Sequence, residues 1–263
     1  MNDAATLAAA DLERRFGGLR RLYGDAGYAR LRAARVAVVG LGGVGSWAVE
    51  ALARSGVAGL VLIDYDHVAE SNVNRQVQAL GATLGMAKVL ALRERIADIH
   101  PGCVVHAVEA FAEAGNWPAL LPHPVDAVID ACDQLRAKAA VAAWALDGGT
   151  PLVVVGAAGG KRRPQAVEVD DLANVTHDPL LAALRQRLRQ HHGAARRGAI
   201  GVRCVFSRES LVMPEQECDV EGNLNCHGYG STVSVTATFG MVAAQIALEF
   251  ALADEAKRPT SWL

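Results

Sequence analysis

The sequence predicts an α/β fold with a doubly wound, mostly parallel sheet and a C-terminal extension. Three observations lead to this class: short β-branched apolar runs, segments of helical period between them, and a glycine-rich turn directly after the first run. Continuous apolar strands are typical of a parallel sheet that is covered on both faces. Strands that alternate with helices predict βαβ units.

The expected elements follow one another in order along the chain. Strands are predicted at residues 35–40, 59–64, 103–109, 125–130 and 151–156, with helices at 46–55, 85–99 and 134–146. Beyond a loop at 157–164 we expect an edge strand at 165–170, a helix at 179–192, a strand at 202–207 and a last helix at 235–253. We divide the chain into an N-terminal helical arm (1–33), a nucleotide-binding core (34–160) and an extension of the same domain (161–263).

Composition narrows the class of protein. The chain has 263 residues, 51% of them hydrophobic, and a net charge of −2, which excludes a disordered protein and indicates no particular partner. Its five cysteines form no CxxC pair, so we expect reduced thiols in a cytoplasmic protein. We expect no signal peptide, because residues 1–11 are acidic and lack a long apolar core. Residues 231–253 are long enough to span a bilayer but carry several polar side chains, so a buried helix is expected rather than membrane insertion.

The strongest motif is the glycine-rich turn between the first strand and the first core helix. Gly40, Gly42 and Gly45 match the GxGxxG spacing of Rossmann-like folds. The first glycine permits a tight turn, the second lets the backbone approach a phosphate, and the third lets helix and strand pack closely. The helix N-terminus then attracts an anion. A tight turn without a ligand is the alternative, and the motif does not say which nucleotide binds.

Polar residues after the second strand narrow the choice of nucleotide. Asp64 ends that strand, where a carboxylate can accept the ribose hydroxyls of a nucleotide, as it does in NAD enzymes. Asn72, Arg75 and Lys88 follow. A nicotinamide dinucleotide has little use for two further cations, whereas a triphosphate losing pyrophosphate needs donors that stabilise the departing charge. Lys88 alone could be a solvated helix residue.

Several segments together resemble one superfamily. GLGGVG at 40–45, DYDHVAESNVNRQ at 64–76, GMAK at 85–88 and VIDACD at 128–133 are similar to the ubiquitin-activating-enzyme superfamily with its ThiF and MoeB members. Within it, RFGGLRRLYG at 15–24, GVGSWAVEALARSG at 43–56 and VTATFGMVA at 235–243 resemble the tRNA threonylcarbamoyladenosine dehydratases, the TcdA or CsdL branch.

This resemblance implies roles for individual residues. Gly43 and its loop would contact the α-phosphate of ATP, Asp64 the ribose, and Asn72 and Arg75 the phosphates. Lys88 would stabilise the departing pyrophosphate, and Asp133 would hold Mg²⁺. The family also implies a homodimer in which Arg15 or Arg21 reaches the nucleotide of the other subunit. A monovalent cation (Na⁺ or K⁺) and a cysteine desulfurase system are further associations of the family.

Two absences favour the tRNA-modifying branch. Relatives that activate sulfur-carrier proteins hold zinc with two CxxC pairs, which this chain lacks, so zinc is not expected. We likewise expect no fused rhodanese domain. Cys226, beside His227, could form a thioester, but an unreactive cysteine in a glycine-rich loop is the preferred interpretation. Cys132 is interpreted as a packing residue.

One local feature indicates a nucleic-acid partner. Residues 179–208 contain seven arginines and no acid, and a second basic cluster occupies 161–163. Basic stretches on a near-neutral chain suit phosphate-backbone binding. We predict that Arg185, Arg189, Arg196 and Arg197 contact tRNA. A solvated helix face is the alternative.

The predicted function is ATP-dependent dehydration of N6-threonylcarbamoyladenosine in tRNA through adenylation of the threonyl carboxylate. Three alternatives stay open: adenylation of a ubiquitin-like sulfur carrier, an NAD-dependent oxidoreductase, and a non-catalytic tRNA-binding protein.

Overall fold

A single seven-stranded sheet forms the centre of the molecule. The computed structural model describes residues 10–212 and 229–253. The strands are β1 (Arg35–Val39), β2 (Gly59–Ile63), β3 (Val104–Val108), β4 (Ala127–Asp130), β5 (Leu152–Val155), β6 (Val167–Asp171) and β7 (Arg203–Ser207). Their order across the sheet is β3-β2-β1-β4-β5-β7-β6, and every neighbouring pair is parallel except β6 with β7. The doubly wound, mostly parallel sheet is therefore confirmed.

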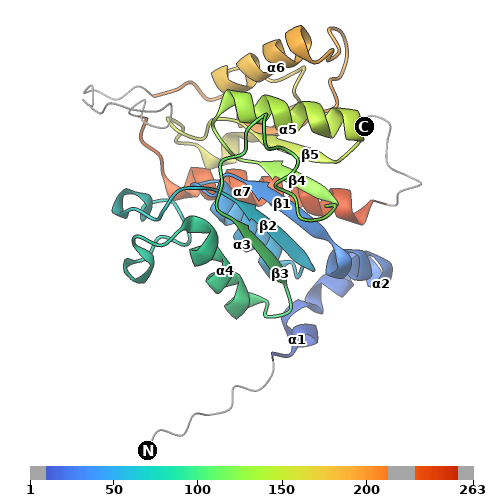
Figure 1. Ribbon diagram of the computed structural model, residues 1–263, viewed down its shortest axis with the longest axis vertical. Helices are drawn as coiled ribbons and strands as arrows, with labels where there is room; N and C mark the ends of the chain where they lie inside the picture. The colour runs from blue at the N-terminus through green and yellow to red at the C-terminus, as the bar shows by residue number, and fades with distance from the viewer. Residues whose placement is uncertain (1–9, 213–228, 254–263) are drawn as a thin grey trace, which may run out of the picture.

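Helices cover both faces of this sheet (Figure 1). They are α1 (Leu12–Phe16), α2 (Gly18–Ala33), α3 (Gly45–Arg54), α4 (Lys88–Ile99), α5 (Leu135–Gly148), α6 (Pro179–His191) and α7 (Val233–Leu252). One core cluster joins the sheet to α3, α4 and α7, and a second joins it to α5 and α6. In β1, Val36 and Val38 belong to the first cluster while Ala37 and Val39 belong to the second, as alternation along a strand requires.

The segment between β2 and α4 differs from the prediction. It contains two short 3-10 turns, η1 (Glu70–Asn72) and η2 (Gly81–Thr83), and α4 begins at Lys88 rather than at residue 85. The later start has a local cause, because Ala87 forms an isolated β-bridge with His67 and the backbone N–H of Lys88 donates to the Asp66 carbonyl at 2.9 Å. This bridge fixes where Lys88 stands relative to the end of β2.

Helix α7 is long and apolar enough to span a membrane, and it is the one such helix found in the described part of the chain. It packs in the core instead, as predicted, and 56% of its apolar 18-residue stretch is buried. Gly240 allows its close contact with α3, since a Cβ there would lie 2.4 Å from the Val44 carbonyl oxygen. Helix α7 therefore packs on the same face of the sheet as α3, in close contact with the start of α3 after the glycine loop.

The sheet topology puts the reversal of strand order, where open α/β sheets have their ligand-binding crevice, at the carboxyl ends of β1 and β4. Strand order runs from β1 to β2 and β3 on one side, and from β4 to β5 and β7 on the other. Ligands of open α/β sheets bind where the order reverses in this way. The glycine loop leaves β1 at this point, and residues 131–134 leave β4 beside it. The extension beyond residue 160 adds β6 and β7 to the same sheet.

Candidate active site

The glycine loop between β1 and α3 is shaped for an anionic ligand. Gly40 has a φ of +83°, and a Cβ at Gly45 would lie 1.8 Å from the Gly40 carbonyl oxygen, so neither position accepts a side chain. Gly42 differs, because no atom lies within 4 Å of the place where its Cβ would stand. The fold leaves open space at Gly42, directly before the N-terminus of α3, where a phosphate can approach the backbone.

Asp64 links the end of β2 to this loop. Its carboxylate is buried and accepts hydrogen bonds from the backbone N–H groups of Leu41 (2.5 Å) and Asp66 (2.8 Å). Burial raises the pKa of Asp64, and the nearby charge of Lys88 opposes that rise. Each carboxylate oxygen accepts one backbone bond and keeps a second lone pair, which is what a ribose diol requires.

Lys88 stands at the first position of α4 and is almost fully buried. Its Nζ forms an ion pair with Asp66 Oδ2 at 2.8 Å, and its charge reaches Asp64. The ammonium is therefore held at the carboxyl edge of β2 by a pre-formed contact. A donor fixed in this way stabilises developing charge without reorganisation.

Arg75 and Asn72 lie on the segment around η1. A Cβ added at Gly43 would lie 3.2 Å from the Cγ of Arg75, so the Arg75 side chain packs directly against the glycine loop. Its Nη1 donates to the Ser71 carbonyl (2.7 Å) and to Asn74 Oδ1 (2.9 Å). Asn72 is buried, and its side-chain oxygen accepts from the Ala69 N–H at 3.1 Å, which leaves the amide nitrogen as the group able to donate to a phosphate. The structure therefore brings Arg75 to the glycine loop, and Asn72 lies three residues before Arg75 on the same segment.

Asp133 lies half-buried just beyond β4, on the other side of the crevice. Within residues 10–212 and 229–253, no group of three His, Cys, Asp or Glu side chains could hold a metal by itself. A single carboxylate beside the phosphate loop fits Mg²⁺, which is held by one or two carboxylates together with phosphate oxygens. The residues present therefore suit a metal that arrives with a nucleotide.

A buried ion pair beneath Asp133 was missed by the sequence reasoning. Lys138 and Asp130 are both fully buried, and Lys138 Nζ lies 3.1 Å from Asp130 Oδ1 and 3.1 Å from the Asp130 carbonyl oxygen. Burial disfavours the ammonium, but the adjoining carboxylate outweighs it and raises the pKa of Lys138 above its ordinary value. A signal was present, because Lys138 shares a helix face with Val141, Ala142 and Ala145, all buried.

The two N-terminal arginines differ in their surroundings. Arg15 donates from Nη1 to the carbonyl oxygens of Asp98 (2.6 Å) and Ile99 (2.7 Å), so it caps the C-terminus of α4 in the same chain. Arg21 is exposed on α2. Because Arg15 is held by its own chain and Arg21 is exposed, Arg21 is the better candidate for contact with another subunit.

The predicted tRNA-binding arginines lie away from this crevice. Arg185 donates to the carbonyls of Leu172 (3.0 Å) and Val175 (2.7 Å), and Arg189 donates to the Ala195 carbonyl (3.0 Å). Arg196 and Arg197 are exposed. Their loop leads into the amino end of β7, whereas the glycine loop leaves the carboxyl end of β1, and both strands belong to the parallel part of the sheet. The exposed pair therefore lies at the opposite edge.

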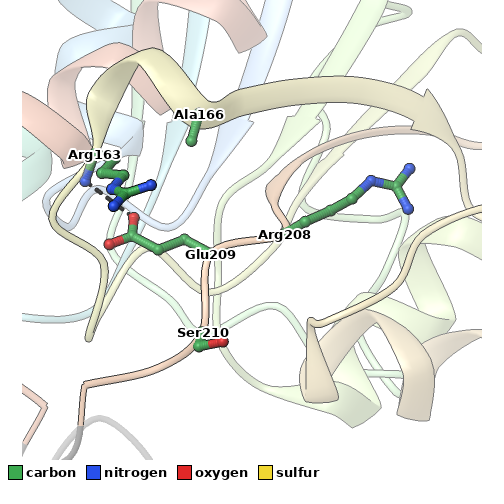
Figure 2. A pocket seen from close by; sticks show the side chains of 5 residues that line it. All are labelled: Arg163, Ala166, Arg208, Glu209 and Ser210. Carbon is green, nitrogen blue, oxygen red and sulfur yellow. Dashed lines mark hydrogen bonds between the residues drawn. The ribbon is translucent and has the colours of Figure 1, made fainter.

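A second basic region lies at the carboxyl edge (Figure 2). Arg163, Ala166, Arg208, Glu209 and Ser210 line a hollow of about 450 Å³. The Glu209 carboxylate accepts from the backbone N–H groups of Arg162 and Arg163, and Arg208 pairs with Glu168 at 2.8 Å. Because the acids offset much of its positive charge, the hollow is not a strong anion site.

The described cysteines are free thiols without reactive character. Burial raises the pKa of Cys132 and Cys204 well above the ordinary value and that of Cys103 to about 11. Cys132 is therefore a packing residue, as predicted. Cys226, the one candidate for a thioester, lies outside the described residues.

The chain is similar over most of its length to several known proteins. A tRNA threonylcarbamoyladenosine dehydratase of Escherichia coli (strain K12) is 43% identical over 256 residues, covering 93% of this chain and 96% of that protein. The corresponding protein of Haemophilus influenzae is 39% identical over 88% of this chain and 90% of its own length. The crystal structure of E. coli TcdA in complex with ATP has a TM-score of 0.83 at 43% identity, covering 91% of this chain and 95% of that chain.

Likeness to the sulfur-carrier branch is partial. E. coli molybdopterin-synthase adenylyltransferase is 35% identical over 127 residues, which cover 48% of this chain and 51% of that protein. The family model described as "ThiF family" matches residues 15–261, nearly the whole sequence. The chain therefore belongs to the ThiF family.

Proposed function

We propose that the chain is an ATP-dependent dehydratase that cyclises N6-threonylcarbamoyladenosine in tRNA. The observation that carries this proposal is the 43% identity to the E. coli dehydratase over nearly the full length of both chains. The crevice supports it, since the open glycine loop, the buried Asp64 carboxylate and the fixed Lys88 ammonium suit the phosphates and ribose of ATP.

The chemistry follows from the substrate. A carboxylate cannot lose oxide at neutral pH, so one threonyl carboxylate oxygen attacks the α-phosphorus of ATP and pyrophosphate departs. The resulting mixed anhydride carries AMP as its leaving group. The carbamoyl group of the same modification then attacks the acyl carbon, the ring closes, and AMP leaves with the carboxylate oxygen. Because both reacting groups belong to one molecule, the effective molarity reaches about 10⁵ M or more.

The side chains at the crevice divide this work. The glycine loop and the N-terminus of α3 hold the phosphates, and Asp64 accepts the ribose hydroxyls. Arg75 and Lys88 stabilise the charge that builds on the departing pyrophosphate. Such stabilisation by fixed donors is usually the largest single contribution to the rate of a step of this kind. Asp133 would hold Mg²⁺, whose charge, when bound, neutralises phosphate oxygens.

The macromolecular partner is proposed to dock at a distance from the chemistry. The exposed Arg196 and Arg197 are the members of the basic stretch best placed to contact tRNA phosphates, while Arg185 and Arg189 mainly orient the backbone around them. We further propose a cytoplasmic homodimer in which Arg21 reaches the neighbouring site. From the same family membership we also propose that the protein binds a monovalent cation and interacts with a cysteine desulfurase system.

Pyrophosphate exchange into ATP separates this function from its rivals. We expect exchange to be stimulated by tRNA that carries N6-threonylcarbamoyladenosine and not by the same tRNA without the modification. Stimulation by a ubiquitin-like sulfur carrier instead would assign the chain to carrier activation. Reduction of NAD by the purified protein would replace adenylation with redox chemistry. Binding of tRNA without exchange would leave a non-catalytic protein.

A further inference from the structure

The buried pair of Lys138 and Asp130 does more than fill space in the core. Taking two charges out of water costs several kcal/mol for each ion, and well-packed apolar residues would often stabilise a fold equally well. What an apolar pair cannot supply is directional hydrogen bonding. Both contacts of Lys138 Nζ go to Asp130, one to the side chain and one to the backbone carbonyl oxygen.

Asp130 passes this constraint to the segment that follows β4. Its Oδ1 accepts from the backbone N–H of Cys132 at 3.1 Å, while the N–H of Ala131 donates to the Val39 carbonyl at 2.8 Å. The Asp130 carboxylate therefore links Lys138 to the backbone of Cys132, the residue directly before Asp133. The strand pairing of β4 with β1 holds Ala131 separately.

The same segment lies directly against the glycine loop. A Cβ at Gly40 would lie 2.7 Å from the backbone nitrogen of Cys132 and 2.8 Å from its Cα, so the two backbones touch. A displacement of residues 131–132 would therefore move the glycine loop, which they touch, or Asp133, which follows them, or both of these. The position of Asp133 relative to the glycine loop therefore depends on this contact.

We infer that Lys138 is a positioning residue which, through Asp130, holds Asp133 in place for the Mg²⁺ that accompanies ATP. The inference rests on the proposed function, because Mg²⁺ enters with the nucleotide. It goes beyond that function by assigning a role to a side chain that touches neither metal nor substrate. Residues that orient a metal ligand in this way change metal affinity by about 10–100-fold when they are replaced.

The test compares two buried lysines. The Asp130→Leu/Lys138→Met double variant removes both charges together with the acceptor for the Cys132 N–H, and it leaves no buried ion unpaired. Lys161→Met is the matched control, since Lys161 is also buried and donates from Nζ to backbone carbonyls, those of Ser207 and Glu209. Calorimetry measures binding of α,β-methylene ATP with and without Mg²⁺, and denaturant unfolding measures stability.

Without Mg²⁺, we expect the double variant to bind the analogue with an affinity within about twofold of wild type. The Mg²⁺ gain, which is the factor by which Mg²⁺ raises that affinity, should be at least about tenfold smaller than in wild type. Lys161→Met should lose stability and keep the Mg²⁺ gain. A folded double variant with the full Mg²⁺ gain would overturn the inference, and so would a wild-type protein without any gain. Neither result bears on exchange stimulated by modified tRNA, so the proposed function is tested separately.

Lys138→Arg keeps the inference testable if the double variant does not fold. It retains the positive charge beside Asp130, but a planar guanidinium does not reproduce the bonds of a compact ammonium. We expect a folded protein with a reduced Mg²⁺ gain. An undiminished gain in this variant would contradict the positioning role.

Discussion

The carboxylate of Asp64 accepts a hydrogen bond from the backbone N–H of Leu41 at 2.5 Å, which joins the end of β2 to the glycine loop. The residue proposed to hold the ribose therefore also fixes the loop proposed to hold the phosphates. Both residues are buried, and the contact involves protein atoms alone. A site built in this way needs little rearrangement on binding.

Asp64→Ala should weaken ATP binding by more than tenfold. The variant removes the acceptor for the ribose hydroxyls and releases Leu41, and hydrogen bonds to a charged group contribute about 1.5–3 kcal/mol each. Calorimetric titration with ATP measures the change. Asp98→Ala on α4, which is exposed, is a control that should bind as wild type does. Equal affinity in Asp64→Ala and wild type would remove the ribose assignment.

Gly42→Ala and Gly45→Ala should fail in different ways. A Cβ at Gly42 meets no atom of the protein, so that variant should unfold at the wild-type denaturant concentration but bind ATP at least tenfold more weakly. A Cβ at Gly45 collides with the Gly40 carbonyl, so that variant should lose stability itself. Undiminished ATP affinity in Gly42→Ala would show that phosphates lie elsewhere.

Lys88→Ala and Arg75→Ala should each slow adenylation by about 10²–10³-fold, because each removes a fixed donor to developing charge. Single-turnover formation of pyrophosphate with modified tRNA measures this rate. Thermal unfolding checks that both variants still fold, which matters most for Lys88 with its buried ion pair to Asp66. Wild-type rates in both variants would refute their role in catalysis.

The fold was more predictable than the site contacts. All seven strands were predicted: the central ones are buried apolar runs, as expected for strands covered on both faces, and β6 was predicted as an edge strand. The glycine loop was recognisable from its spacing. The Lys138–Asp130 pair could not be derived in the same way, since it depends on how α5 packs under β4. The cap that Arg15 makes on α4, 83 residues away in sequence, is likewise a product of tertiary packing. The functional roles of the site residues stay predictions.

Stability should fall in acid partly through Glu50. This buried carboxylate bridges α3 and α4 by accepting from Arg54 (2.7 Å) and Arg95 (2.6 Å). Burial raises its pKa, but the two arginines outweigh burial and lower the pKa below its ordinary value of 4.5. The folded state therefore gains stability from Glu50 above that value and loses it as pH falls through the lowered pKa.

Glu50→Gln tests this contribution directly. We expect a loss of about 1–3 kcal/mol in unfolding free energy at pH 7, since a hydrogen-bonded charge is removed, and a smaller loss near pH 3. Urea unfolding across that range measures both. Glu94→Gln, an exposed site on α4, should behave as wild type. Equal losses at both pH values would contradict the proposed linkage.

Replacing Arg196 and Arg197 with Gln should weaken tRNA binding and flatten its salt dependence. Each phosphate contact removed lowers the slope of log affinity against log salt by about 0.7–0.9. Tyr65→Ser, at an exposed residue beside Asp64, affects the other edge of the sheet and should leave that slope unchanged. ATP affinity should not change in the double arginine variant. An unaltered slope would return this loop to the interpretation of a solvated surface.

Oxygen transfer tests the central claim most directly. Modified tRNA whose threonyl carboxylate is labelled with ¹⁸O is incubated with the protein and ATP, and the nucleotide products are analysed by mass spectrometry. If the carboxylate is adenylated, each cyclised tRNA should yield one AMP that carries one ¹⁸O atom, because the bond to phosphorus forms through that oxygen. Cyclised tRNA accompanied by unlabelled AMP, or by ADP and phosphate, would contradict adenylation as the mechanism.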